Sequence, residues 1–156
     1  MRKWFLLPLF VVLATLELTW PKSLTFFYAR PDLLLSLAIA AVFYFDFKVA
    51  LAISILCGLT KDIFLPVGFG MNTILFSIWC FCTHTLLRQI SAELVFMPLV
   101  LVLAVALFNN ILFGLVGVNL GNIIPWGIFL RNLVIPPVYT AAASVLVFKL
   151  TKRISV

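Results

Sequence analysis

Residues 94–118 form a run of 25 residues without a charged side chain, and this run limits the possible folds more than any other feature. A helix needs about 20 apolar residues to cross the roughly 30 Å hydrocarbon core of a bilayer. Because the run is long enough to cross a bilayer, it predicts a transmembrane helix. Shorter apolar stretches, separated by short polar segments, fill most of the remaining chain.

The composition indicates that lipid surrounds most of the folded chain. Hydrophobic residues make up 65% of the 156 residues and charged residues 10%, whereas about a quarter of the residues in a soluble domain are charged. Eleven Lys and Arg with five Asp and Glu are too few to cover a globule of 17.5 kDa. The sequence therefore predicts one all-α domain over residues 1–156, a polytopic membrane helix bundle.

Six transmembrane helices are predicted from the apolar stretches and from the residues that interrupt them. The first is expected to be an uncleaved helix, because residues 17–21 lack the small-residue pattern of a signal-peptide cleavage site. A loop is expected over residues 119–132, and Pro136 and Pro137 should kink the last helix or delay its regular start. The predicted helices cover about residues 4–20, 31–45, 49–64, 71–87, 94–118 and 133–150.

The basic residues lie singly between apolar stretches and act as signals of membrane topology. They form no basic helix face with interleaved aromatic residues, so nucleic-acid binding is not expected. Cytoplasmic loops are enriched in Lys and Arg, and six crossings place Arg2, Lys3, Lys48, Arg88, Lys149, Lys152 and Arg153 on the side of both termini. The other side holds Lys22, Arg30, Lys61 and Arg131. Both termini are therefore expected in the cytoplasm.

Small and acidic residues recur at every fourth position of the second and third predicted helices. The second helix carries Asp32, Ser36 and Ala40, and the third carries Ala50, Ser54, Gly58 and Asp62. Residues four apart share a helix face, and small residues let membrane helices approach closely. The short turn at residues 46–48 makes these helices antiparallel neighbours. If the two stripes face each other, both aspartates meet near the outer end of the pair.

Each of these aspartates has a basic neighbour in the sequence, Arg30 or Lys61. Charged side chains inside a bilayer are costly and usually pair with one another. We therefore hypothesise a compact polar cluster of Arg30, Asp32, Lys61 and Asp62, with Pro31 at the first position of the second helix. In the alternative, each charge reaches the lipid headgroups separately, since all four lie near helix ends.

Other polar residues give weaker signals. His84 has no second His and no carboxylate within two turns, so no metal site is expected, and no cofactor motif is present. Glu17 either faces the bundle or marks a helix end, while Asn109 and Asn110 either bind a partner helix or hydrogen-bond a neighbouring one. An activated nucleophile is not expected, because no base lies beside Ser36, Ser54, Ser77 or Ser144.

Three short motifs carry a resemblance to a known family. Residues 30–35 read RPDLLL and resemble a signature of the MreD family, bacterial rod shape-determining membrane proteins. Residues 58–62 read GLTKD and resemble that family's G-L-x-x-D. Gly70 and Asn72, in the sequence GMN, resemble the G-x-N that opens its next helix, where Asn72 is a candidate cap. The chain departs from the family at residues 46–48, often a basic cluster, and at Lys61, where an uncharged residue is common.

The resemblance implies a non-enzymatic scaffold of the cell-elongation machinery in the bacterial inner membrane, which helps to maintain rod shape and lateral peptidoglycan synthesis. It implies as partners the membrane-anchored periplasmic protein MreC, the actin-like MreB, and RodA with its transpeptidase partner. It also implies a six-helix fold similar to the substrate-binding subunits of energy-coupling-factor vitamin importers. Arg30, Asp32 and Asp62 are expected to fix the outer surface rather than to touch a partner. The alternative function is a small-molecule-binding membrane subunit of a transporter, which requires a polar pocket among the helices.

Overall fold

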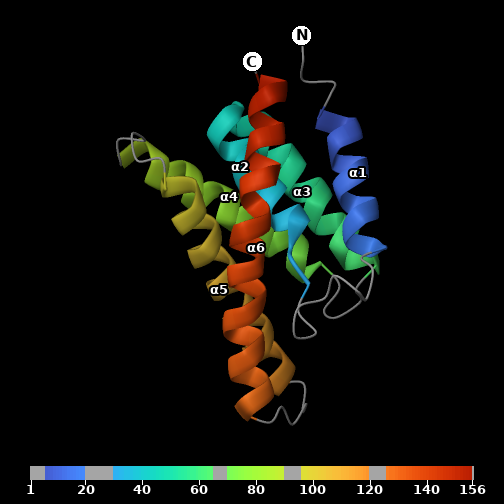
Figure 1. Ribbon diagram of the computed structural model, residues 1–156, viewed down its shortest axis with the longest axis vertical. Coiled ribbons are helices and arrows are strands. Elements are labelled where there is room, and N and C mark those ends of the chain that lie inside the picture. The colour runs from blue at the N-terminus through green and yellow to red at the C-terminus, as the bar shows by residue number, and fades with distance from the viewer. Residues whose placement is uncertain (1–5, 20–29, 65–69, 90–95, 120–125, 156) are drawn as a thin grey trace.

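The computed structural model describes residues 6–19, 30–64, 70–89, 96–119 and 126–155. Over these residues it contains six helices and no strands, which confirms the all-α prediction and the helix count. Successive helices alternate in direction, so α1 begins and α6 ends at the same end of the molecule (Figure 1). The helices are α1 (Leu6–Leu18), α2 (Leu33–Tyr44), α3 (Phe47–Phe64), α4 (Met71–Gln89), α5 (Met97–Asn119) and α6 (Trp126–Ser155).

The helix α2 lies at the centre of the bundle. Every residue from Leu33 to Val42 is buried, and α2 contacts each of the other five described helices. Such a helix has no face that needs polar side chains, which explains why its sequence is apolar on all sides. With 12 residues it is about 18 Å long, at about 1.5 Å per residue. The other helices are therefore arranged around a short apolar axis.

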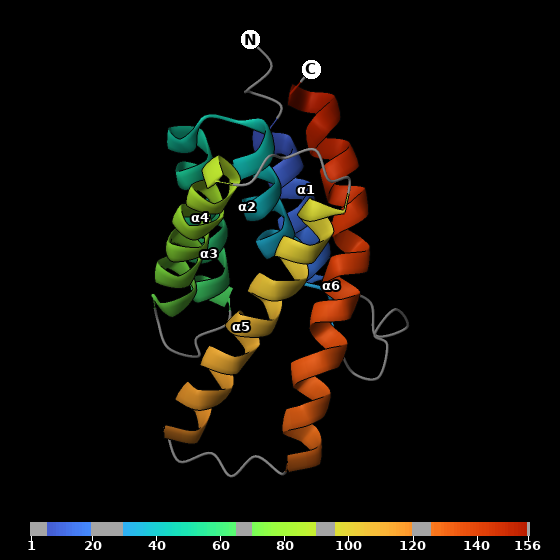
Figure 2. The ribbon, with the colours of Figure 1, turned by 90° about the vertical axis from the view of Figure 1, so that its left-hand side faces the viewer.

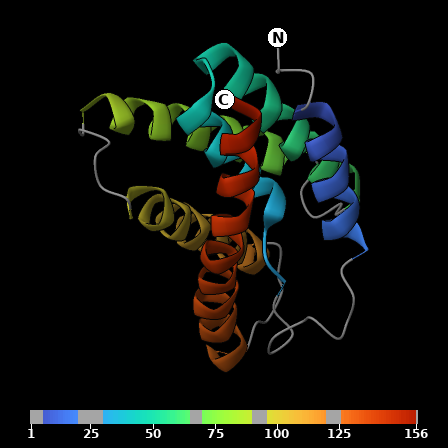
Figure 3. The same cartoon turned by 45° about the horizontal axis from the view of Figure 1, so that its top comes forward.

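The helices α5 and α6 are the longest, with 23 and 30 residues. They contact each other and extend past the ends of α1–α4 (Figures 1 and 2). Figure 3 shows the first half of α6 standing clear of α1–α4. We call residues 111–119 of α5 and 126–135 of α6 the projecting hairpin. None of these described hairpin residues is buried.

Two of the described helices are long and apolar enough to cross a membrane, namely α5 over Met97–Asn119 and α6 over Trp126–Ile154. The helices α1 and α2 are apolar but shorter. The helix α3 has 18 residues and contains Lys48, Lys61 and Asp62, so it is less apolar than α5. The structure thus shows six helices, two of which can cross a bilayer by length and composition.

The helix α6 begins earlier than the sequence predicts. The expected loop over residues 119–132 is wrong beyond residue 125, because α6 starts at Trp126 and continues through Pro136 and Pro137. Proline lacks an N–H, so Pro136 cannot donate to the carbonyl of Asn132 four residues earlier. Asn110 of α5 donates its Nδ2 hydrogen to this carbonyl oxygen instead, at 2.9 Å. A side chain of the neighbouring helix thus replaces one lost backbone hydrogen bond.

Candidate functional site

Two carboxylates from different parts of the chain cap the N-terminus of α2. Asp32 is the N-cap residue, and its Oδ1 accepts a hydrogen bond from the Leu35 N–H at 2.9 Å. Glu17 of α1 accepts with Oε2 from the Leu34 N–H at 2.8 Å. The first N–H groups of a helix have no partner within it, and negative groups are favoured at this end. Pro31 precedes the cap, so it does not occupy the first helical position that the sequence suggests.

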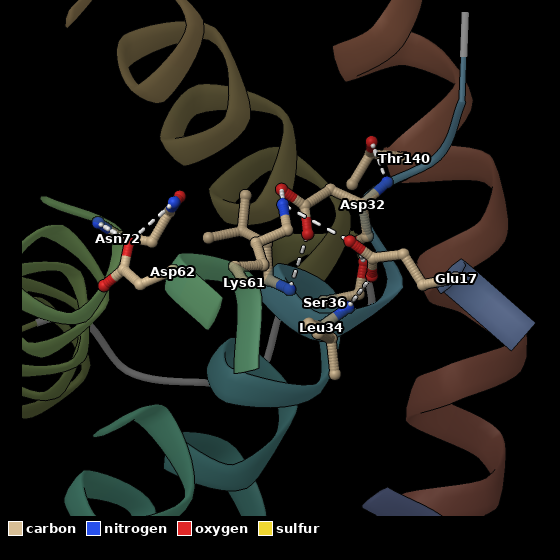
Figure 4. Close-up of polar contacts among 9 residues, drawn as sticks. Glu17, Asp32, Leu34, Ser36, Lys61, Asp62, Asn72 and Thr140 are labelled. Atoms are coloured by element: carbon tan, nitrogen blue, oxygen red, sulfur yellow. Dashed lines mark hydrogen bonds and ion pairs between the residues drawn. The ribbon is translucent and has the colours of Figure 1, made fainter. Parts of the chain in front are cut away.

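Lys61 of α3 lies between these two carboxylates. Its Nζ forms a hydrogen-bonded ion pair with Asp32 Oδ2 and lies 3.4 Å from Glu17 Oε1. The side chains are mostly buried, with 12% of Lys61, 14% of Glu17 and 18% of Asp32 exposed. The ring of the fully buried Phe76 of α4 adds a cation–π contact, with its centroid 5.5 Å from Nζ. We call Glu17, Asp32 and Lys61 the charged triad (Figure 4).

Asp62 belongs to a second network, which holds the first turn of α4. Its Oδ1 accepts from the backbone N–H and from Nδ2 of Asn72, both at 3.0 Å. Its Oδ2 accepts from the Thr73 N–H at 2.9 Å and from Thr73 Oγ1 at 2.6 Å. Asp62 is only 2% exposed. It therefore caps α4 from the preceding helix, and we call these three residues the α4 cap.

Two glycines make the α4 cap possible. A Cβ atom at Gly58 would lie 2.5 Å from Thr73 Cα and 2.9 Å from the Asn72 carbonyl oxygen, so only glycine lets α3 approach α4 this closely. Gly58 lies one turn before Asp62 and shares its helix face. Gly70 has a φ of +88°, a left-handed conformation that glycine adopts without a steric penalty. The second motif (residues 58–62) and the third motif (residues 70–72) therefore serve the same purpose, which is to pack the start of α4 against α3.

The structure separates the single cluster that the sequence suggests into these two networks. It brings Lys61 to Asp32 and adds Glu17, whereas Asp62 points to Asn72 and away from Asp32 (Figure 4). Arg30 is exposed, and among the described residues it forms no ion pair with either aspartate. The hypothesis of one cluster that contains both aspartates is therefore replaced by two helix caps on different helices.

The small residues of α2 and α3 are buried, as close helix packing requires. No surface is exposed at Ser36, Ala40, Ala50 or Ser54. The stripe on α3 does not face α2 along its whole length, because Gly58 contacts the backbone of α4. The expectation that the two stripes meet at their outer ends is corrected accordingly.

A cavity of about 530 Å³ lies beside the charged triad. Its wall combines α1, the start of α2, the end of α3, and the middle of α5 and α6. Thr140 of α6 lines it and accepts a hydrogen bond from the Asp32 N–H at 2.9 Å. The volume lies within the range of about 300–1,000 Å³ that is typical of small-molecule sites. We call this space the charged cavity.

Glu17 and Thr140 are the site residues that sequence reasoning does not assign. Of the two expected positions for Glu17, facing the bundle or marking a helix end, the structure shows the first. The sequence feature that could have indicated this role is that Glu17 is the only acidic residue before Asp32. Thr140 gives no such signal, because threonines in apolar helices commonly bond to their own backbone. For Asn110, the structure shows the second of the two expected roles, a hydrogen bond to the neighbouring helix α6.

Among the described residues, His84 and the acidic side chains form no recognisable metal site. No group of three or more His, Cys, Asp or Glu side chains is placed to hold a metal ion in the part of the chain that the structure describes. The His84 ring instead packs against Phe47 of α3, with ring centroids 4.7 Å apart. The side chains of Glu17, Asp32, Lys61 and Asp62 thus form helix caps and an ion-paired lysine beside a cavity.

The family model described as rod shape-determining protein MreD matches residues 1–154. No curated protein and no solved structure gives a significant match to this chain, so a similarity to vitamin-importer subunits is not shown. Each of the three family-like motifs supplies a residue to the two helix caps, namely Asp32, Asp62 and Asn72. The family match extends over nearly all of the 156 residues. The chain therefore belongs to the MreD family of rod shape-determining membrane proteins.

Proposed function

We propose that this chain is a non-enzymatic membrane scaffold of the bacterial cell-elongation machinery, which helps to maintain rod shape and lateral peptidoglycan synthesis. The observation that carries the proposal is the match of residues 1–154 to a rod shape-determining family. The motif residues support it, because they cap helices and hold them together rather than assemble a nucleophile with a base. A scaffold needs such firmly held helices to present a constant surface to its partners.

We assign the projecting hairpin to the binding of an MreC-type protein. Such a partner is anchored in the membrane and has a periplasmic portion. Large apolar side chains point outward from this hairpin, with 80% of Trp126 and 55% of Leu130 exposed. Membrane helices associate through close van der Waals packing, and this part of α5 and α6 has free faces for another helix. MreB, RodA and its transpeptidase partner are further members of the same machinery by family resemblance.

The proposal places the chain in the inner membrane with six crossings and both termini in the cytoplasm. Among the described residues, the end where α1 begins and α6 ends carries Lys48, Arg88, Lys149, Lys152 and Arg153. The other end carries Arg30, Lys61 and Arg131. The excess of Lys and Arg supports a cytoplasmic location for the first end. The projecting hairpin then lies toward the periplasm, where the soluble portion of the partner is expected.

Affinity purification of the tagged full chain in a mild detergent tests the proposal. Recovery of a single-span protein with a coiled coil and a periplasmic domain, in a constant ratio, is the expected result. Failure to recover such a protein from cells that contain it would contradict the scaffold function. Recovery of an ATPase module would instead favour the transporter alternative, for which the charged cavity of about 530 Å³ is the supporting observation.

A further inference from the structure

We propose that the charged cavity is a binding site for the headgroup of a phospholipid that carries a primary ammonium, such as phosphatidylethanolamine. The charged cavity would hold the headgroup, and the acyl chains would remain in the surrounding membrane. The proposal does not depend on partner binding by the projecting hairpin. It assigns a ligand to a part of the molecule that the scaffold function leaves unused.

The charged cavity presents both signs of charge to a ligand. The charged triad has two carboxylates and one ammonium, so it carries a net charge of −1 when all three groups are ionised. Arg30 also lines the cavity and is exposed, so it adds one positive charge that is accessible to a ligand. A ligand with one cationic and one anionic group matches this arrangement better than a simple anion or a simple cation.

The carboxylates retain hydrogen-bonding capacity. An ionised carboxylate has about four acceptor positions. Asp32 uses its oxygens for Leu35 and Lys61, and Glu17 uses its oxygens for Leu34 and Lys61. A primary ammonium has three N–H donors for the remaining positions, whereas a quaternary ammonium has none. A phosphate group suits Arg30, because a guanidinium can donate two parallel hydrogen bonds to its oxygens.

A lipid of the surrounding membrane can reach the charged cavity. The helices α5 and α6, which supply Ala106, Asn110 and Thr140 to its wall, are long and apolar enough to cross a bilayer. The acyl chains of a lipid that is bound through its headgroup therefore stay in the hydrocarbon region beside these helices.

Native mass spectrometry of the purified full chain tests the proposal with three lipids at equal concentration: phosphatidylethanolamine, phosphatidylcholine and phosphatidylglycerol. We expect one molecule of phosphatidylethanolamine to be retained, and this lipid to raise the apparent melting temperature more than the other two. Equal retention of all three lipids would mean that they only surround the protein, and would overturn the proposal. A preference for phosphatidylglycerol would overturn it as well, since that lipid lacks the ammonium.

Two matched variants locate the site. Arg30→Gln removes the exposed cation of the charged cavity, and we expect it to weaken phosphatidylethanolamine retention on the order of tenfold, the loss expected for one charge-assisted contact. Arg88→Gln removes another exposed arginine at the end of α4, outside the cavity, and should have no effect. Because both side chains are exposed, both variants should fold. An equal effect of the two variants, or no effect of either, would overturn the proposal.

A third variant tests recognition of the ammonium. Glu17→Gln keeps an oxygen that can accept from Leu34 but removes the negative charge, so the preference for phosphatidylethanolamine over phosphatidylcholine should decrease. An unchanged preference in a folded Glu17→Gln protein would contradict the assigned role of the carboxylate. If this variant does not fold, the comparison of Arg30→Gln with Arg88→Gln still decides the question.

Discussion

The capped ends of α2 and α4 and the projecting hairpin differ in where their side chains find partners. In the capped ends, Asp62 is 2% exposed and makes four hydrogen bonds within the chain, and Lys61 meets two carboxylates. In the hairpin, Trp126 is 80% exposed and Leu130 is 55% exposed. This difference supports the proposed division of roles, in which the capped ends hold the helices together and the hairpin offers a surface to another molecule.

Replacement of the triad lysine should have the largest effect on stability. Lys61→Met leaves the carboxylates of Glu17 and Asp32 close together without a cation, and breaking a buried ion pair costs about 3–5 kcal/mol. The free energy of unfolding, measured in detergent, should decrease by about this amount. Lys48→Met, at the exposed other end of α3, is the control and should change stability little.

The same experiment includes a variant that should recover stability. Combining Lys61→Met with Glu17→Gln and Asp32→Asn removes all three charges, so much of the lost stability should return. A Lys61→Met protein as stable as the wild type would show that the triad does not hold α1, α2 and α3 together. The capped end of α2 would then differ from the hairpin in burial alone.

Removal of the α4 cap should have the next largest effect. Asp62→Ala leaves the donors of Asn72 and Thr73 without their acceptors, and we expect a loss of about 2–4 kcal/mol from the cap and the buried donors. Asp62→Asn should lie between wild type and Asp62→Ala, because one acceptor oxygen is replaced by a donor amide. Thermal unfolding in detergent measures both variants. Wild-type stability of Asp62→Ala would contradict the capping role.

The helices are largely predictable from the sequence, because apolar runs and the polar residues between them are local signals. The expected starts and ends of α3 and α4 differ from the observed ones by at most two residues, as is usual at helix ends. The start of α6 is an exception. Residues 126–132 contain Gly and Asn and precede two prolines, which locally indicates a loop, and the compensating hydrogen bond comes from Asn110 of another helix.

The site is only partly predictable, for a geometric reason. The motifs identify Asp32 and Asp62, but Lys61 and Asp62 are adjacent in α3, and adjacent residues on a helix point about 100° apart. They therefore serve different neighbours, Lys61 the triad and Asp62 the α4 cap. Which neighbour each one meets depends on how α4 and α1 pack, and no local pattern in the sequence contains that information.

Adding a methyl group to a glycine should have opposite effects in the two regions. Gly58→Ala places a Cβ against the backbone of α4, and such overpacking costs about 1–3 kcal/mol. Gly127→Ala in the hairpin meets nothing within 4 Å, so the higher helix propensity of alanine should leave stability unchanged or raise it by up to about 1 kcal/mol. Equal effects of Gly58→Ala and Gly127→Ala on the melting temperature would contradict the inference that the capped ends are more tightly packed than the hairpin.

The smallest effect is expected where the hairpin joins the bundle. Asn110→Ala removes the hydrogen bond to the Asn132 carbonyl, which should cost about 1 kcal/mol. Because the loss is local, amide hydrogen exchange should increase at residues 132–135, next to the prolines, and remain unchanged in α2. Asn119→Ala, at the exposed end of α5, is the control. Unchanged exchange in Asn110→Ala would show that α6 passes its prolines without this support.

The division of roles is tested most directly by measuring partner retention and melting temperature together for Val134→Trp and Val145→Trp. Both valines lie on α6 and are similarly exposed, at 52% and 56%, but only Val134 belongs to the projecting hairpin. We expect Val134→Trp to reduce retention of an MreC-type partner by at least about tenfold, the loss of one well-packed contact, with an unchanged melting temperature. Val145→Trp should preserve both. Full retention of the partner by Val134→Trp, or equal loss in both variants, would contradict the assignment of partner binding to the hairpin.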